Sequence, residues 1–180
     1  KKAKEKKRLA KIDYFRDAPN GGDLNVSYAL GLGLKVCTDE SYLAARVLRL
    51  VTLGSLEPEL EPGKKNRASM RFLREPHNGD PFDEALYTFL QAAAGADGVL
   101  QDRELEDFCY DDRHAKTLSD MLESCHHQGE LTLSRGGCLK GNQCRRAKDL
   151  TARGQQQRDE LLGLKRYLLD FSLLAERDVK

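Results

Sequence analysis

Apolar side chains recur at helical spacing in residues 42–60 (YLAARVLRLVTLGSLEPEL), and the helix they predict ends at a glycine. Four of them fall on one face of a helix because they are separated by four, three and one positions: Leu43, Val47, Leu50 and Val51. Gly54 supplies the left-handed residue that commonly ends a helix. A short strand around Leu56 is expected directly after it, so this stretch predicts a helix, a tight turn and a strand.

A weaker copy of this pattern lies 75 residues downstream, in residues 116–134 (KTLSDMLESCHHQGELTLS), with Gly129 at the place of Gly54. Leu131 and Leu133 alternate with polar residues, as they would in a half-buried strand. Helix, glycine turn, strand, loop and returning strand is the order of a winged helix-turn-helix. The sequence therefore predicts a mainly α protein with small β-wings (α+β), built as tandem winged-helix-like units followed by a C-terminal helix.

Turn and capping signals suggest where these units begin and end. Asp23 and Asp80 are expected to cap helices, and Pro81 occupies the first helical position after Asp80. The turn-rich segment 61–66 is the expected first wing, and Ala68 to Leu73 the returning strand. The expected divisions are a basic juxtamembrane-like lead-in at 1–11, a first winged-helix-like unit at 12–76, a second at 77–154 and a C-terminal helix at 155–180.

Positive charge is concentrated at the start of the chain. Residues 1–11 hold seven Lys and Arg against one Glu, whereas the whole chain carries a formal charge of +1. The remainder is therefore about −5. Dedicated DNA-binding domains are usually clearly basic, because neutralising phosphates supplies most of their affinity. The charge balance outside the lead-in argues against that class.

Cysteine and histidine provide the only metal-like set of side chains. Its members are Cys125, His126, His127, Cys138 and Cys144. Their spacing matches no common zinc finger, and Cys125 also falls on the apolar face of the predicted helix. The five cysteines are an odd number, which favours free thiols in a reducing compartment. We expect no metal, no cofactor, no small-molecule substrate and no enzymatic activity.

Residues 150–179 (LTARGQQQRDELLGLKRYLLDFSLLAERDV) carry a recognisable series of short motifs: LTARG, then GLKRYL, DFS and ERD. This series resembles the C-terminal cytoplasmic region of the YciQ-like predicted membrane proteins, a bacterial family described as a domain of unknown function. The resemblance implies a larger protein with an extracytoplasmic domain and transmembrane helices, and it places this region on the cytoplasmic face of the cell membrane. It brings no catalytic residues.

Two functions fit these observations. The first is a protein-interaction or scaffold module, with an unidentified protein partner and with residues 1–11 near anionic headgroups. The second is a membrane-tethered winged-helix regulator that binds nucleic acid through a basic surface. Its candidate contacts on the first helix and wing are Arg46, Arg49, Lys64, Lys65 and Arg67. The second expected wing adds Arg135, Lys140, Arg145, Arg146 and Lys148. The acidic balance and the implied membrane tether favour the first function.

Overall fold

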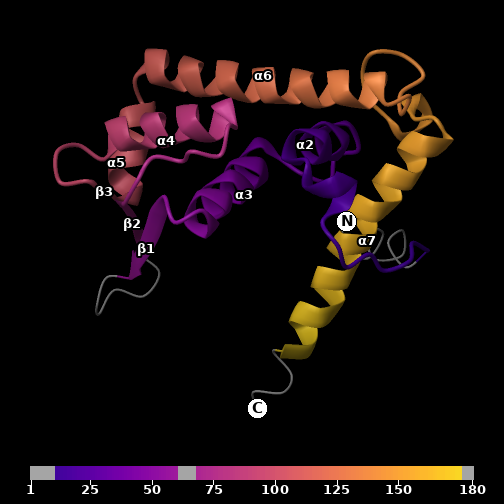
Figure 1. The fold of residues 1–180 in the computed structure, drawn as a ribbon, viewed down its shortest axis with the longest axis horizontal. Helices are drawn as coiled ribbons and strands as arrows, with labels where there is room; N and C mark the ends of the chain where they lie inside the picture. The colour runs from indigo at the N-terminus through magenta and orange to yellow at the C-terminus, as the bar shows by residue number, and fades with distance from the viewer. Residues whose placement is uncertain (1–10, 61–67, 176–180) are drawn as a thin grey trace. The chain divides into compact units, whose positions relative to one another are not determined.

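The computed structural model describes residues 11–60 and 68–175 of the chain, which are mainly helical with a small three-stranded antiparallel sheet (Figure 1). The coarse fold class expected from the sequence is therefore confirmed. The elements in chain order are η1 (Pro19–Gly22), α2 (Leu24–Gly33), α3 (Asp39–Thr52), β1 (Leu56–Leu60), β2 (Ala68–Phe72), α4 (Pro81–Ala93), β3 (Val99–Leu100), α5 (Asp102–Cys109), α6 (Asp112–Arg135), η2 (Ala147–Asp149) and α7 (Ala152–Ala175).

The chain forms two compact units that interleave in sequence. Unit 2 is continuous, from Asp39 to Ser124, whereas unit 1 combines residues 1–38 with residues 125–180. Helix α6 begins in unit 2 and ends in unit 1. The sequence-based boundary at 76/77 falls inside unit 2, and the one at 154/155 falls inside unit 1.

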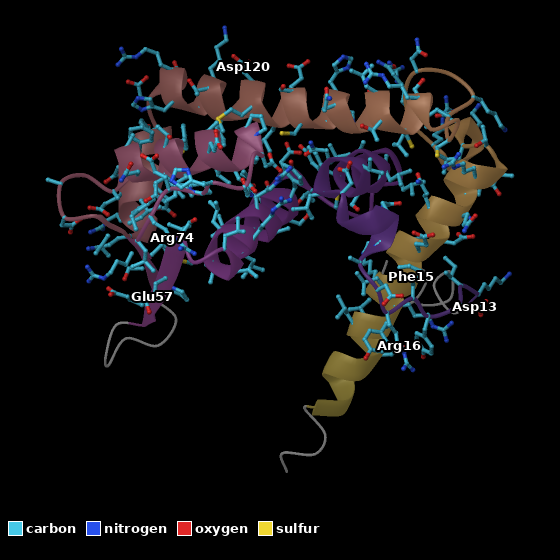
Figure 2. The ribbon with its side chains drawn as sticks, viewed as in Figure 1. Asp13, Phe15, Arg16, Glu57, Arg74 and Asp120 are labelled. Carbon is cyan, nitrogen blue, oxygen red and sulfur yellow. The ribbon has the colours of Figure 1, made fainter. Side chains whose placement is uncertain are left out.

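Unit 2 contains the helix, glycine turn and two strands expected from residues 42–73. Helix α3 is followed by Gly54, whose φ of 70° is the left-handed conformation that ends a helix. Strands β1 and β2 pair antiparallel, with Leu56 opposite Phe72, and β3 adds to the other edge of β2. Arg74 follows β2 and donates from Nη2 to the Leu53 carbonyl at 2.8 Å, which fixes the turn after α3 (Figure 2). The first predicted helix–strand–strand segment is thus confirmed.

Helix α4 packs its apolar face against β3, α3 and α5. Asp80 caps the helix by accepting the Phe82 N–H at 3.1 Å, and Pro81 stands at the first position, both as expected. The apolar face is buried through Phe82, Leu86, Tyr87, Phe89, Leu90 and Ala93. Two edge-to-face ring contacts extend this core, Phe72 with Tyr87 and Phe89 with Phe108.

The second copy of the predicted helix–turn–strand pattern is wrong, because this part of the chain forms one long helix, α6. It continues from Asp112 to Arg135 without a break, so the strand predicted around Leu131 and Leu133 is helical. Gly129 does not end the helix. A side chain there would lie 2.6 Å from the Asn25 carbonyl carbon of α2, so glycine lets two backbones approach closely. In the helix Leu131 and Leu133 point in different directions, and only Leu133, which is 1 % exposed, is buried.

Unit 1 packs α2, the end of α6, the following loop and α7 around one core. Its buried members are Val26, Ala29, Leu30, Leu34, Leu133, Cys138, Leu139, Cys144 and Leu150. Asp23 caps α2 by accepting the Val26 N–H at 3.0 Å, as the sequence predicts. Glycines again allow close contacts: a Cβ at Gly33 would lie 2.8 Å from the Cys144 carbonyl carbon, and one at Gly154 3.0 Å from that of Cys138.

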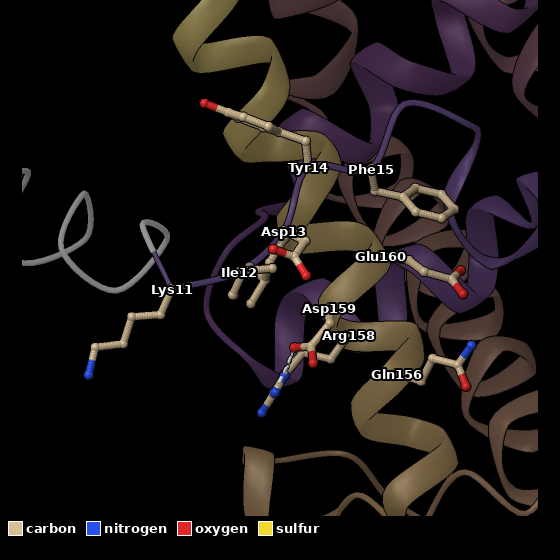
Figure 3. Close-up of a pocket in the computed structure, with 10 residues that line it drawn as sticks. Lys11, Ile12, Asp13, Tyr14, Phe15, Gln156, Arg158, Asp159 and Glu160 are labelled. Carbon is tan, nitrogen blue, oxygen red and sulfur yellow. Dashed lines mark hydrogen bonds and ion pairs between the residues drawn. The ribbon is translucent and has the colours of Figure 1, made fainter.

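The segment before η1 runs along α7 (Figure 3). Tyr14 donates to Asp170 at 2.9 Å, and Arg166 donates to the Ile12 carbonyl. Residues 11–15 and the first half of α7 line an open hollow of about 560 Å³. Three of its charged side chains are paired: Arg158 binds Asp159 at 2.6 Å, and Glu160 accepts the Asn20 N–H at 3.2 Å.

Helix α7 confirms the C-terminal helix predicted by the leucine spacing. None of the helices in the described ranges combines the length and the apolar character that a bilayer-crossing helix needs.

Candidate functional site

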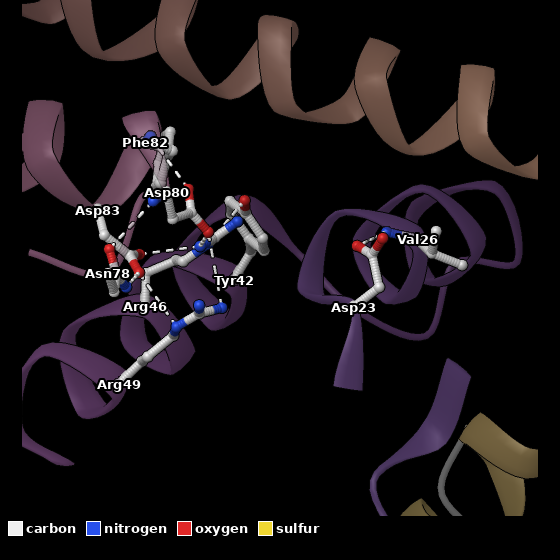
Figure 4. Close-up of polar contacts among 9 residues, drawn as sticks. All are labelled: Asp23, Val26, Tyr42, Arg46, Arg49, Asn78, Asp80, Phe82 and Asp83. Carbon is white, nitrogen blue, oxygen red and sulfur yellow. Dashed lines mark hydrogen bonds and ion pairs between the residues drawn. The ribbon is translucent and has the colours of Figure 1, made fainter. Parts of the chain in front are cut away.

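Arg46, the first residue proposed for nucleic-acid contact, lies inside unit 2. Its side chain is 1 % exposed and donates from Nη1 to Asp80 at 2.6 Å and to Asp83 at 2.8 Å (Figure 4). Its Nε donates to the Tyr42 hydroxyl at 2.9 Å, and its guanidinium lies 4.9 Å from the centre of the Phe82 ring. The expectation that Arg46 faces solvent on the polar side of its helix is therefore wrong.

Arg49 joins the same network from one turn further along α3. Its Nε lies 3.0 Å from Asp83 and its Nη1 3.6 Å from Asp80, and 35 % of its side chain is exposed. Asn78 also donates to Asp83, at 2.6 Å. Two arginines of α3 and two aspartates at the start of α4 thus form one ion-pair network, which we call the arginine network: Arg46, Arg49, Asp80 and Asp83.

The electrostatics of the arginine network stabilise its charged state. Burial by itself would lower the pKa of Arg46, but the hydrogen bonds that Arg46 donates to Asp80 and Tyr42 outweigh it and raise that pKa above its ordinary value. Burial likewise would raise the pKa of Asp80, whereas the bonded Arg46 guanidinium holds it below the usual range. Both groups are therefore ionised at neutral pH, and the network joins α3 to α4.

The other three proposed contacts, Lys64, Lys65 and Arg67, lie outside the described residues. The basic residues that the sequence analysis assigned to a second wing do lie close together, although not on a wing. Four of them, Lys140, Arg145, Arg146 and Lys148, belong to the segment 136–151 between α6 and α7, which we call the cationic loop, and Arg135 is the last residue of α6.

The cationic loop folds back on itself. Leu139 and Leu150 form an isolated antiparallel bridge, and the Lys140 N–H donates to the Asp149 carbonyl at 2.8 Å. The Asp149 side chain closes the tip by accepting the N–H of Arg145 at 3.1 Å and of Arg146 at 2.9 Å. The backbone of the loop is thus held by its own carboxylate.

Buried groups anchor the cationic loop to the core of unit 1. Cys138, Leu139, Cys144 and Leu150 are buried. Glu130 of α6, itself buried, accepts the Cys144 N–H at 3.0 Å. Sequence reasoning missed Glu130 because only the tertiary fold brings it to a backbone group 14 positions away.

The buried cysteines have the properties of packed apolar groups. Burial, together with the nearby Asp149 and Glu130 carboxylates, raises the pKa of the Cys144 thiol to about 11. At neutral pH it is a protonated thiol within the core. Across residues 11–60 and 68–175, no group of three or more His, Cys, Asp or Glu is arranged to hold a metal ion.

The outer surface of the cationic loop is basic. Arg145, Arg146, Lys140 and Lys148 are exposed, and with Gly141, Asn142, Gln143 and Asp149 they line an open hollow of about 740 Å³. Four exposed cations thus lie on one described surface, and this chemistry suits an anionic partner.

Comparison of the chain with protein-family models, with curated proteins and with solved structures found no match.

Proposed function

We propose that this chain is a protein-interaction or scaffold module, without enzymatic activity, of a larger bacterial membrane protein, and that it works at the cytoplasmic face of the cell membrane. The resemblance of residues 150–179 to the YciQ-like family supports the membrane protein. The order of α3, Gly54, β1 and β2 supports a winged-helix-like interaction surface in unit 2. Such folds bind proteins as well as nucleic acids, so the choice between them depends on the surface.

The observation that carries the proposal is the arginine network. A nucleic-acid-binding helix offers its arginines to phosphates and base edges. Here Arg46 is buried between Asp80 and Asp83, and Arg49 binds the same two carboxylates. Turning Arg46 outward would remove one of the two guanidinium partners of the fully buried Asp83 and leave its charge less well compensated, which is unfavourable. Arg46 is therefore held within unit 2, and Arg49 would have to leave the same two carboxylates to reach a nucleic acid.

The charge of unit 2 supports the same choice. Residues 39–124 contain 18 acidic and 10 basic residues, a net of −8, even with the basic residues of the expected wing included. A surface with this balance repels a phosphate backbone at long range. A protein partner with basic and apolar groups suits it better.

Exposed leucines in unit 2 indicate where such a partner can be trapped. Leu48 on α3 is 64 % exposed and Leu73 after β2 is 53 % exposed. A single exposed leucine is ordinary, so these positions serve to place a probe. Thr88, on the exposed side of α4, serves as the matched control position.

The test combines two measurements. A photo-crosslinking amino acid placed at Leu48 of the chain in cells is expected to give a discrete protein adduct that Thr88 does not give. Fluorescence anisotropy with a labelled DNA duplex at low salt is expected to give the same affinity for the purified chain and for a Lys64→Glu, Lys65→Glu variant. Salt-sensitive duplex binding that is lost in a Lys64→Glu, Lys65→Glu variant would replace this proposal by the membrane-tethered nucleic-acid-binding regulator. If no adduct forms at Leu48, the proposal that a protein partner binds at α3 is contradicted.

A further inference from the structure

Beyond residues 1–11, positive charge in unit 1 is concentrated around the cationic loop. Residues 135–153 contain six basic residues and one acidic residue. All six basic side chains are exposed: Arg135, Lys140, Arg145, Arg146, Lys148 and Arg153. The single acid, Asp149, already accepts two backbone N–H groups of the loop. The surface that a ligand meets is therefore almost purely cationic.

The loop holds these cations on a fixed backbone. The Leu139–Leu150 bridge closes its base, Glu130 binds the Cys144 N–H, and Thr151 donates from its hydroxyl to the Gly137 carbonyl at 2.7 Å. Little backbone entropy is then lost when an anion binds, which improves affinity. Lys140 Nζ also donates to the Lys148 carbonyl at 2.9 Å, which orders the Lys140 side chain.

We propose that the cationic loop docks on the anionic headgroups of a lipid bilayer. Clusters of four to eight Lys and Arg are typical of surfaces that bind acidic phospholipids, and adjacent arginines such as Arg145 and Arg146 can each bind phosphate oxygens in a bidentate manner. The inference rests on the proposed function in placing the chain beside a membrane, and it adds a second contact to the one expected for residues 1–11.

Two features favour lipid over nucleic acid. Residues 135–153 contain no aromatic side chain, so the loop offers no ring on which a base could stack. The basic side chains of residues 136–151 belong to a loop that folds back on itself, and not to a helix that could enter a groove of DNA. A headgroup layer needs neither feature, because a dense plane of negative charge is enough to attract the loop.

The decisive variant is Arg145→Gln, Arg146→Gln. Each Lys or Arg near an anionic surface contributes about fivefold to binding, so losing two weakens it about 30-fold. Both side chains are exposed and only their backbone N–H groups bind Asp149, so the fold is expected to persist. The matched control is Arg103→Gln, Lys116→Gln, which removes two exposed cations from unit 2.

The assay is sedimentation of the purified full chain with vesicles of phosphatidylcholine alone or with 30 % phosphatidylserine, across a range of salt. We expect binding only to the acidic vesicles, weakened by salt, about 30-fold weaker in the loop variant and within threefold of the parent in the control. The parent and the loop variant are also titrated with labelled duplex and single-stranded DNA.

Three outcomes overturn the inference. If the loop variant binds acidic vesicles like the parent, while removing residues 1–11 abolishes binding, the membrane contact belongs to the lead-in alone. If the parent binds DNA but not acidic vesicles, and the loop variant loses DNA binding, the loop recognises nucleic acid. If the parent binds neither, the loop has no role in docking. The crosslinking result at Leu48 is independent of all three, so the two proposals fail separately.

Discussion

Replacing Gly129 by alanine tests the close contact between α6 and α2. An added Cβ would lie 2.6 Å from the Asn25 carbonyl carbon and 3.0 Å from the Ala29 Cβ, whereas ordinary contacts begin at 3.4 Å. The two helices must separate by about 1 Å. Overpacking of this kind costs roughly 1–3 kcal/mol, and the upper end applies because the contacted atoms belong to the backbone and cannot rotate away.

Helix propensity acts in the opposite direction in the same variant. Alanine is favoured over glycine in a helix interior by about 1 kcal/mol. The expected net effect of Gly129→Ala is therefore a loss of about 2 kcal/mol, or roughly 4–8 °C in Tm for a chain of this length. Urea denaturation followed by circular dichroism at 222 nm measures it. Gly141→Ala is the control, since a Cβ there meets nothing within 4 Å, and it is expected to change stability by less than about 0.5 kcal/mol.

A second variant separates the close contact from a helix stop. If Gly129 ended a helix in the left-handed conformation, asparagine would be tolerated there, because Asn adopts that conformation more readily than most residues. In the close contact with α2, asparagine is larger than alanine and costs more. Gly129→Ala that stabilises the chain by about 1 kcal/mol, or Gly129→Asn that is nearly neutral, would refute the helix contact.

Three further predictions concern buried polar groups. Arg46→Met leaves the buried Asp83 with only Arg49 and Asn78 as partners, and it is expected to destabilise unit 2 by about 3 kcal/mol in urea denaturation. Much of this loss should be recovered in the Arg46→Met, Asp80→Asn, Asp83→Asn variant, and no recovery would contradict the ion-pair account. Glu130→Gln weakens the bond to the Cys144 N–H from a charge-assisted to a neutral one, so hydrogen exchange at that amide should rise several-fold while exchange in unit 2 stays unchanged. The pKa of Cys144 is about 11, above the ordinary thiol value of 9.0, so the protonated thiol contributes fully to stability below pH 9 and this contribution is lost as pH rises toward 11. The decrease in unfolding free energy at alkaline pH should therefore be about 2–3 kcal/mol smaller in Cys144→Ala than in the parent. An identical pH dependence in the two proteins would disprove the shift.

Local signals predicted the parts of the fold that depend on neighbouring residues. Asp23 and Asp80 cap helices because their carboxylates reach N–H groups two or three positions ahead. Gly54 ends α3 because its φ of 70° favours glycine, and β1 follows directly. These outcomes are set within a few residues, so a linear reading finds them.

The sequence could not distinguish the two roles of glycine. Gly54 is needed for its own backbone conformation, whereas Gly129 is needed for the space that the Asn25 backbone occupies. Asn25 is more than 100 positions away, and no local pattern indicates its approach. The same limit applies to Arg46, whose helical position suggested solvent until the fold brought Asp80 and Asp83 to it.

The net charge of the whole chain likewise does not show how charge is divided between the two folded units. The formal charge of +1 combines unit 2, at −8, with unit 1, whose 20 basic and 11 acidic residues give +9. At physiological salt, charges interact over about 8 Å, so a partner responds to the unit it meets and not to the total. The positive unit 1 attracts a phosphate-bearing surface, whereas the negative unit 2 repels it. If the cationic loop holds unit 1 against headgroups, the acidic unit 2 is disfavoured at the same surface and is left to a protein partner, so one chain can serve both contacts.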